Sequence, residues 1–185
     1  MIRVSFQGER GAYSEDAAIS FFHDKIQTIS CQTFAKVLKN TEDGESDYSI
    51  LPIENSLEGS VGESNDLLLS TNLNAIGEIY YQIAHCLIGK GQIEDVDTVY
   101  SHPQALGQCR QFIQEHLLKA IPSYDTAGSV KIIKELNSKN SACIASKGAA
   151  KIYDVPVIQE GIADKTNNYT RFLIFSQKKI DKTKN

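Results

Sequence analysis

The sequence lacks the features of a membrane, exported or nucleic-acid-binding protein. No apolar run in its 185 residues approaches the roughly 18 residues that cross a bilayer. Its first residues, MIRVSFQGERG, lack the charged, apolar and small-residue order of a signal peptide. It has no basic block, because 19 Lys and Arg stand against 23 Asp and Glu, for a formal net charge of −4. These absences argue against nucleic acid or a membrane as partner and predict a cytoplasmic protein.

Cysteine and histidine are few and poorly spaced for binding a metal. The sequence has 4 cysteines (Cys31, Cys86, Cys109 and Cys143), without a C-x-x-C pair, and its 4 histidines show no ligand spacing. Cysteines so far apart are most simply explained as small buried hydrophobic residues that stay reduced. We therefore expect neither disulfides nor a metal site.

Short β-branched apolar runs alternate with segments of helical periodicity. The predicted strands are Ile2–Phe6, Ile26–Ser30, Tyr48–Pro52, Ala75–Leu87, Thr98–Tyr100, Ser141–Ala145, Pro156–Glu160 and Arg171–Ser176. The predicted helices are Ser14–His23, Phe34–Asn40, Gly62–Ser70, Pro103–Leu118, Ala127–Leu136 and Lys147–Tyr153. Strands separated by single helices predict an α/β fold.

Polar loops lie between several of these strands and the helices that follow. They are Gln7–Ser14, Glu54–Glu63, Ser101–Gln104 and Asp125–Ser129. Gly8 and Gly11 would let the first loop approach a ligand closely. Helix capping explains the serines of two other loops, because the capping-box pattern S-x-x-E begins at Ser60 and the pattern S-x-x-Q begins at Ser101. Since loops at strand ends converge in an α/β fold and helix N-termini favour anions, we expect a small anionic ligand.

Four segments resemble, in order, the motifs of the prephenate dehydratase family. They are FQGERGAYSEDAA, LPIENSLEGSVG, SHPQALGQC and NNYTRF. Asp164 also stands six residues before Thr170, where the family usually has an aspartate. The resemblance extends from about Phe6 to Phe175, and four motifs in the family's order make coincidence hard to sustain. One departure is Asp125, which places a charge where the family pattern S-T-A has a neutral hydroxyl.

The resemblance implies a two-lobed α/β fold like that of type II periplasmic binding proteins, with a cleft between the lobes. Lobe 1 would hold residues 1–75 and 163–185, and lobe 2 would hold residues 76–162. The Ala75–Leu87 and Ile162–Asn168 segments would cross between them. The chain stops 13 residues after Phe172, so we expect no ACT or chorismate mutase domain. Family members usually self-associate, and a homodimer is expected.

The activity implied by the resemblance is the decarboxylating dehydration of prephenate to phenylpyruvate, in phenylalanine biosynthesis, without a cofactor. Thr170 would donate to the leaving hydroxyl. The substrate-binding residues that the matched motifs imply are Asn55, Ser101, Gln108, Arg171, Thr126, Ser60, Glu54 and Phe172. A structural salt bridge explains Arg171 equally well, and a structural hydrogen bond is the favoured role for His102.

Two alternatives stay open. Arogenate, which carries an amine where prephenate has a keto group, is the rival substrate, and Asp125 could favour its ammonium group. A two-lobed protein that binds a small anion without chemistry is the other alternative, although such receptors are usually exported and this sequence shows no signal segment.

Overall fold

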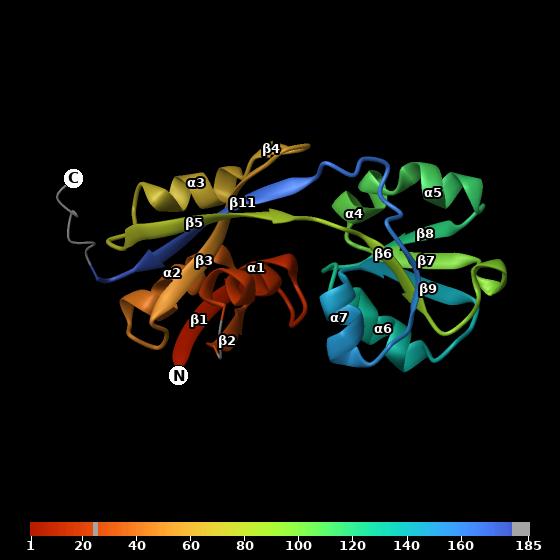
Figure 1. Ribbon diagram of the computed structural model, residues 1–185, viewed down its shortest axis with the longest axis horizontal. Helices are drawn as coiled ribbons and strands as arrows, with labels where there is room; N and C mark the ends of the chain where they lie inside the picture. Colours follow the sequence, from red (N-terminus) through yellow and green to blue (C-terminus); the bar gives the residue numbers. More distant parts are fainter. Residues whose placement is uncertain (24–25, 179–185) are drawn as a thin grey trace. The chain divides into compact units, whose positions relative to one another are not determined.

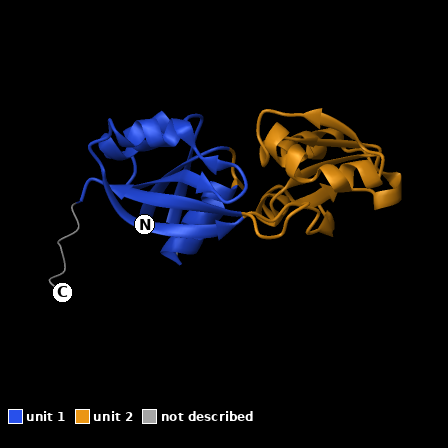
Figure 2. Cartoon of the chain, turned by 90° about the horizontal axis from the view of Figure 1, so that it is seen from above, with its two compact units in different colours: residues 1–8, 13–82, 169–185 blue, residues 9–12, 83–168 orange. Residues whose placement is uncertain are grey.

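The computed structural model describes residues 1–23 and 26–178, and the chain divides into two compact units (Figure 2). Unit 1 comprises Met1–Gly8, Tyr13–Gln82 and Tyr169–Asn185, of which residues 179–185 lie outside the described part. Unit 2 comprises Glu9–Ala12 and Ile83–Asn168. The two-lobed α/β prediction is therefore confirmed, while the cleft stays a prediction. The units change at residues 82 and 168, a few residues after the predicted boundaries near 75 and 162.

Unit 1 is a mixed sheet in the order β2-β1-β3-β11-β5 (Figure 1). Its strands are β1 (Ile2–Gln7), β2 (Ile26–Cys31), β3 (Tyr48–Asn55), the short β4 (Gly59–Ser60) paired with β3, β5 (Asn74–Gln82) and β11 (Tyr169–Ser176). Its helices are α1 (Tyr13–Phe22), α2 (Phe34–Glu42) and α3 (Gly62–Leu68). β11 runs antiparallel to both β3 and β5, so the end of the chain returns to the middle of this sheet.

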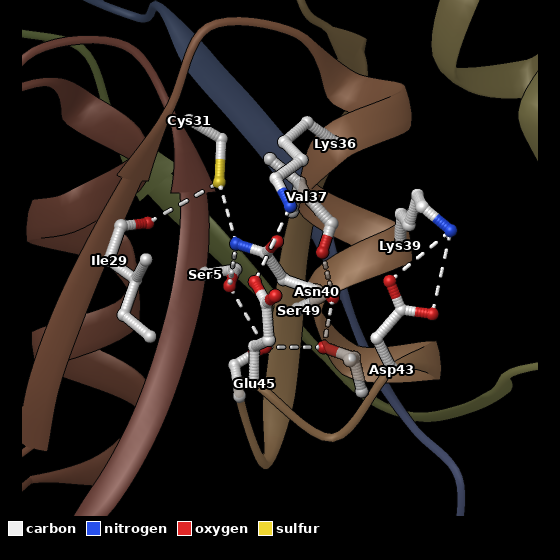
Figure 3. Close-up of polar contacts among 12 residues, drawn as sticks. Ser5, Ile29, Cys31, Lys36, Val37, Lys39, Asn40, Asp43, Glu45 and Ser49 are labelled. Atoms are coloured by element: carbon white, nitrogen blue, oxygen red, sulfur yellow. Dashed lines mark hydrogen bonds and ion pairs between the residues drawn. The ribbon is translucent and has the colours of Figure 1, made fainter.

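Hydrogen bonds among buried hydroxyl groups connect α2 to the sheet of unit 1 (Figure 3). Ser49 Oγ donates to a carbonyl oxygen of α2 at 2.8 Å, and Thr41 Oγ1 contacts both Ser46 and Ser49. Ser5 Oγ donates to Ser46 Oγ at 2.8 Å, and Asn40 Nδ2 donates to Ser5 Oγ at 3.4 Å. Since each hydroxyl has one proton, the bonds run in one direction from Asn40 to the helix carbonyl. A chain of this kind fixes how α2 sits on the sheet.

Unit 2 is a second mixed sheet in the order β10-β6-β9-β7-β8. Its strands are β6 (Cys86–Gly89), β7 (Thr98–Ser101), β8 (Lys119–Pro122), β9 (Ser141–Ala145) and β10 (Val157–Glu160). Its helices are η1 (Ile93–Asp95), α4 (Pro103–Gln108), α5 (Arg110–Glu115), α6 (Gly128–Leu136) and α7 (Lys147–Tyr153). Every residue of β9 is buried, since its alternate side chains enter two hydrophobic clusters, one with α6 and α7 and the other with α4 and α5.

The cysteines are free and buried, as the sequence predicts. Burial raises the pKa of the Cys109 thiol to about 12 and also raises the pKa of Cys143. Among residues 1–23 and 26–178, no group of His, Cys, Asp and Glu side chains is arranged to hold a metal ion. No helix in this described part is long and apolar enough to span a membrane.

Two predicted elements are divided in the structure. The Ala75–Leu87 run is not one strand, because it supplies β5 to unit 1 and β6 to unit 2. The helix predicted over Pro103–Leu118 breaks at Cys109, which has φ −119° and ψ 27° and whose N–H reaches back only to Leu106. The break lets α4 and α5 both contribute to the same hydrophobic cluster.

Candidate active site

A buried pair of polar side chains joins β3 to β11 in unit 1. Asn55 and Thr170 lie opposite each other in the strand pairing, and each is 7% exposed. Asn55 Nδ2 donates to Thr170 Oγ1 at 2.9 Å and to the Tyr169 carbonyl oxygen at 3.3 Å. The first of these bonds uses a lone pair of the hydroxyl and leaves its proton for donation. The Thr170 hydroxyl, which accepts from Asn55, can therefore still donate a hydrogen bond of its own.

The turn after β3 holds the other end of the Asn55 side chain. Asn55 Oδ1 accepts the N–H groups of Leu57 at 2.9 Å and Glu58 at 3.0 Å. Because the oxygen serves both turn amides, the nitrogen must point toward Thr170. The E-N-S motif thus specifies the direction of the bond as well as its partners.

Arg171 and Phe172, which follow Thr170 on β11, have structural surroundings. Arg171 Nε and Nη2 contact a carboxylate oxygen of Glu78 at 2.8 and 2.7 Å, and Glu54 is the cross-strand neighbour of Arg171. The hydrogen bond that Arg171 donates to Glu78 is the main cause that raises the pKa of Arg171. Phe172 is 2% exposed in the core. Since neighbouring residues of a strand face opposite sides, Arg171 does not share the face of Thr170.

Ser60 lies on β4, where it pairs with Glu54, and it is exposed. The predicted capping box of Ser60 and Glu63 is wrong, because the N-cap of α3 is Val61, which makes no side-chain cap bond. The Val61 N–H donates instead to the Ile53 carbonyl oxygen at 2.9 Å. The chain therefore continues its pairing with β3 until α3 begins, and Ser60 is held as a strand residue.

Ser101 is completely buried at the end of β7, and its Oγ donates to the Ile144 carbonyl oxygen at 2.7 Å. The predicted capping box of Ser101 and Gln104 is wrong. The N-cap of α4 is His102, whose Nδ1 accepts the Gln104 N–H at 3.3 Å. His102 therefore has the structural hydrogen bond that the sequence favours. Pro103 lies in the first turn of α4.

Gln108, at the end of α4, is the centre of a second polar group, the Gln108 cluster (His85, Gln108 and Asn168). Gln108 Oε1 lies 2.9 Å from His85 Nε2 and accepts from Asn168 Nδ2 at 3.0 Å. His85 is 2% exposed, and its burial lowers its pKa. Asn168 is anchored in turn through its carbonyl oxygen, which accepts the Ile83 N–H at 2.8 Å. Two donors on Oε1 direct the Gln108 amide nitrogen away from both partners.

Asp164 stands at the position of the family aspartate. Its hydrogen bonds connect the loop before Asn168 to α4 and α5. Its Oδ1 accepts the Gln111 N–H at 3.0 Å, and its own N–H donates to the Gln108 carbonyl oxygen at 2.8 Å. These bonds hold the ends of α4 and α5 together. The contacts give Asp164 a structural role beside the Gln108 cluster.

Thr126 is half-buried in the loop before α6, whose N-cap is Ala127, and its neighbour Asp125 bonds the first residue of that helix. Asp125 Oδ1 accepts the Gly128 N–H at 2.6 Å, and its carbonyl oxygen accepts the Ser129 hydroxyl at 2.8 Å. The carboxylate thus accepts one of the N–H groups of the first turn of α6. The departure at Asp125 has a structural explanation, and its effect on substrate choice stays a prediction.

Gly11 lies in close contact with α7 of unit 2. The sequence had instead suggested that this glycine lets its loop approach a ligand. It has φ +88°, and a Cβ placed there would lie 2.5 Å from the Ala149 Cα. Ser146 Oγ donates to the Gly11 carbonyl oxygen at 2.8 Å and accepts the Ala149 N–H at 2.9 Å. Glu9, in the same loop, forms an ion pair with Lys131. These contacts explain why Glu9–Ala12, placed in lobe 1 by the sequence prediction, belongs to unit 2.

Gly11→Ala should lower the free energy of unfolding by about 3 kcal/mol, from backbone strain and overpacking together. Gly44→Ala is the matched control, because Gly44 has φ +75° and nothing within 4 Å of an added Cβ. It should cost only about 1 kcal/mol. Urea unfolding of both variants measures the difference. Equal losses would show that the contact of Gly11 with α7 does not require glycine.

Sequence reasoning missed two residues of the Gln108 cluster. Asn168 belongs to the NNYTRF segment, so a signal for it was present. His85 had no comparable signal, since its partner Gln108 lies 23 positions away and neither residue matches a ligand spacing.

The sequence model of the prephenate dehydratase family matches residues 4–180. This chain belongs to that family. It is 40% identical over 181 residues to arogenate dehydratase/prephenate dehydratase 2 of Arabidopsis thaliana, covering 97% of this chain and 47% of the relative. Among solved structures, a prephenate dehydratase of Arthrobacter aurescens in complex with L-Phe is similar, with a TM-score of 0.88, 26% identity and coverage of 97% of this chain and 61% of that one.

The family member described here spans about half the length of the curated relatives it matches. Its fold is also similar to that of a candidate methionine-binding lipoprotein from Bacillus subtilis, with a TM-score of 0.50, 12% identity and coverage of 96% of this chain and 83% of that one. That likeness concerns the fold alone, and it confirms the predicted resemblance to periplasmic binding proteins.

Proposed function

We propose that this chain converts prephenate to phenylpyruvate, water and carbon dioxide, as a step of phenylalanine biosynthesis. The observation that carries the proposal is the Asn55–Thr170 bond, in which the donor is Asn55 and the hydroxyl proton of Thr170 remains for the substrate. Membership of the prephenate dehydratase family supports it independently.

The reaction breaks two bonds of the substrate ring. The bond to the ring carboxylate breaks and leaves its electron pair in the ring, while the C–O bond breaks and the oxygen takes a proton to leave as water. Negative charge develops on the departing oxygen, so a donor placed there stabilises the transition state more than the ground state. Thr170 supplies that donor, and the proton that completes water comes through it from solvent.

Recognition of the substrate carboxylates is assigned to neutral donors. The Gln108 amide nitrogen is oriented for such a bond by the two donors on its oxygen. Thr126 and the backbone near Ser60 are the further candidates. Neutral donors avoid the desolvation cost of a buried cation. Ser101 supports this group from inside unit 2, since its hydroxyl already donates to Ile144.

The residues next to Thr170 are assigned supporting positions. Arg171 is paired with Glu78, and Glu54 lies beside it, so a carboxylate ligand there would meet two like charges. Phe172 is buried in the core. We therefore place the substrate on the Thr170 face of β11, with Arg171 and Glu54 on the other.

The test is a direct assay of the purified chain with prephenate and, separately, with arogenate. Phenylpyruvate is read by its absorbance in alkali and phenylalanine by amino-acid analysis, each against a protein-free control at neutral pH. Turnover of prephenate is the expected result. Turnover of arogenate alone would correct the substrate, and calorimetric binding without turnover of either would favour the non-catalytic alternative.

A homodimer remains a proposal from the family resemblance, and a cytoplasmic location remains a proposal from the sequence. Light scattering after size-exclusion chromatography measures the first, with a mass of about twice 20.5 kDa as the expected value. A single-chain mass would contradict it.

A further inference from the structure

Two donors of different residues converge on one atom of the Gln108 cluster. His85 Nε2 lies 2.9 Å from Gln108 Oε1, and Asn168 Nδ2 lies 3.0 Å from the same oxygen. His85 approaches from the segment just before β6, and Asn168 from the residue just before β11. Neither residue belongs to the motif that contains Gln108.

The protonation of the His85 ring follows from these contacts. The ring is 2% exposed, and burial lowers its pKa, which keeps it neutral. A neutral imidazole carries one N–H, and an Nε2 atom that faces a carbonyl oxygen must be the one that carries it. The backbone beneath the ring is fixed, since the His85 carbonyl oxygen accepts the N–H groups of Gly161 at 3.1 Å and Ile162 at 3.2 Å.

A primary carboxamide can turn by half a revolution and exchange its oxygen and nitrogen with little change of shape. In Gln108 that turn would place the NH₂ group against two donors, His85 Nε2–H and Asn168 NH₂. Both hydrogen bonds would be lost, and donor would face donor at about 3 Å. One orientation of the Gln108 carboxamide is therefore strongly preferred.

We propose that His85 is a positioning residue, which fixes the orientation of the Gln108 carboxamide so that its nitrogen, and not its oxygen, is the atom presented to a substrate carboxylate. This inference rests on the proposed role of Gln108 in binding. His85 itself does not touch the substrate. It acts by removing the alternative orientation, in which Gln108 would present an oxygen to an anion.

The test compares His85→Leu with His85→Gln, whose amide nitrogen can stand where the ring Nε2 stands. Loss of the donor should raise KM for prephenate about tenfold and change kcat by less than about threefold, since carboxylate binding is shared by ground state and transition state. His85→Gln should return KM to within about threefold of wild type. His116→Leu is the matched control, because His116 is exposed, lies in the same unit and contacts only its own helix in the bonds described.

A merely structural histidine predicts a different pattern. His85→Leu would then lower the melting temperature without changing KM, and His85→Gln would not restore the melting temperature. These two results together would overturn the proposal. The double variant with Gln108→Leu sharpens the test. His85→Leu should add no further loss of affinity once Gln108 is gone, and additive losses would contradict the proposal.

Calorimetric binding of prephenate or phenylpyruvate separates this inference from the proposed activity. If the wild-type chain turns over nothing but binds either compound, the activity fails and the dissociation constants of the same variants still decide the role of His85. Nitrogen NMR of labelled histidine gives the second readout, with a protonated Nε2 expected for His85. A ring protonated at Nδ1 alone, or failure of the wild type to bind either compound, would refute the inference.

Discussion

Thr170→Val should lower kcat for prephenate by roughly 10²- to 10³-fold, the effect expected when a single preorganised donor to a developing oxyanion is removed. Valine keeps the volume and β-branching that suit the β11 strand, so the fold should persist. The loss should fall on kcat more than on KM, because the charge on the departing oxygen exists only in the transition state. Steady-state kinetics on prephenate measure it.

Thr170→Ser is the control for that result. Serine retains the hydroxyl and the acceptor for Asn55 Nδ2, which donates at 2.9 Å in the wild type, so most of the rate should remain. Thr170→Val leaves that nitrogen its longer bond to the Tyr169 carbonyl oxygen, at a cost of about 1–2 kcal/mol in stability. If Thr170→Val kept the wild-type kcat, the proposed role of Thr170 as the donor to the departing oxygen would be wrong.

Much of the fold is predictable from apolar periodicity. The alternation of strands and helices predicts the α/β class, and most strands appear within a few residues of their predicted ends. β8 was not predicted from the sequence, because it is a short, largely exposed edge strand that ends at Pro122. Its residues show no alternation of apolar and polar side chains. The prediction of one strand over Ala75–Leu87 was wrong. A continuous apolar pattern does not show where the chain leaves one hydrophobic core and enters another.

The residues of the candidate site could be selected from the sequence, but the directions of their hydrogen bonds could not. Motif resemblance selects Asn55, Thr170 and Gln108, yet it cannot say which atom donates. The two serine capping boxes failed because Ser60 continues a strand pairing and Ser101 is turned into unit 2 toward Ile144. Both outcomes depend on partners distant in sequence, which local patterns do not encode.

Asn55→Asp should reverse the hydrogen bond on which the proposed activity depends. The carboxylate can still accept the N–H groups of Leu57 and Glu58, so the turn and the fold should survive. It cannot donate to Thr170 Oγ1, and the threonine hydroxyl must instead donate to the carboxylate. The proton that the substrate needs is then already bound, and kcat should fall roughly 10²-fold or more.

The pH dependence of Asn55→Asp distinguishes this cause from simple damage to the site. A protonated aspartic acid again carries an O–H that can donate to Thr170, so the ratio of the variant's rate to the wild-type rate should rise as the pH is lowered. The double variant with Thr170→Val provides the second check. If the two residues act as one donor unit, the double variant should be no slower than Thr170→Val alone. Multiplicative losses, or a rate ratio that does not change with pH, would mean that Asn55 contributes by some route other than the direction of its bond to Thr170.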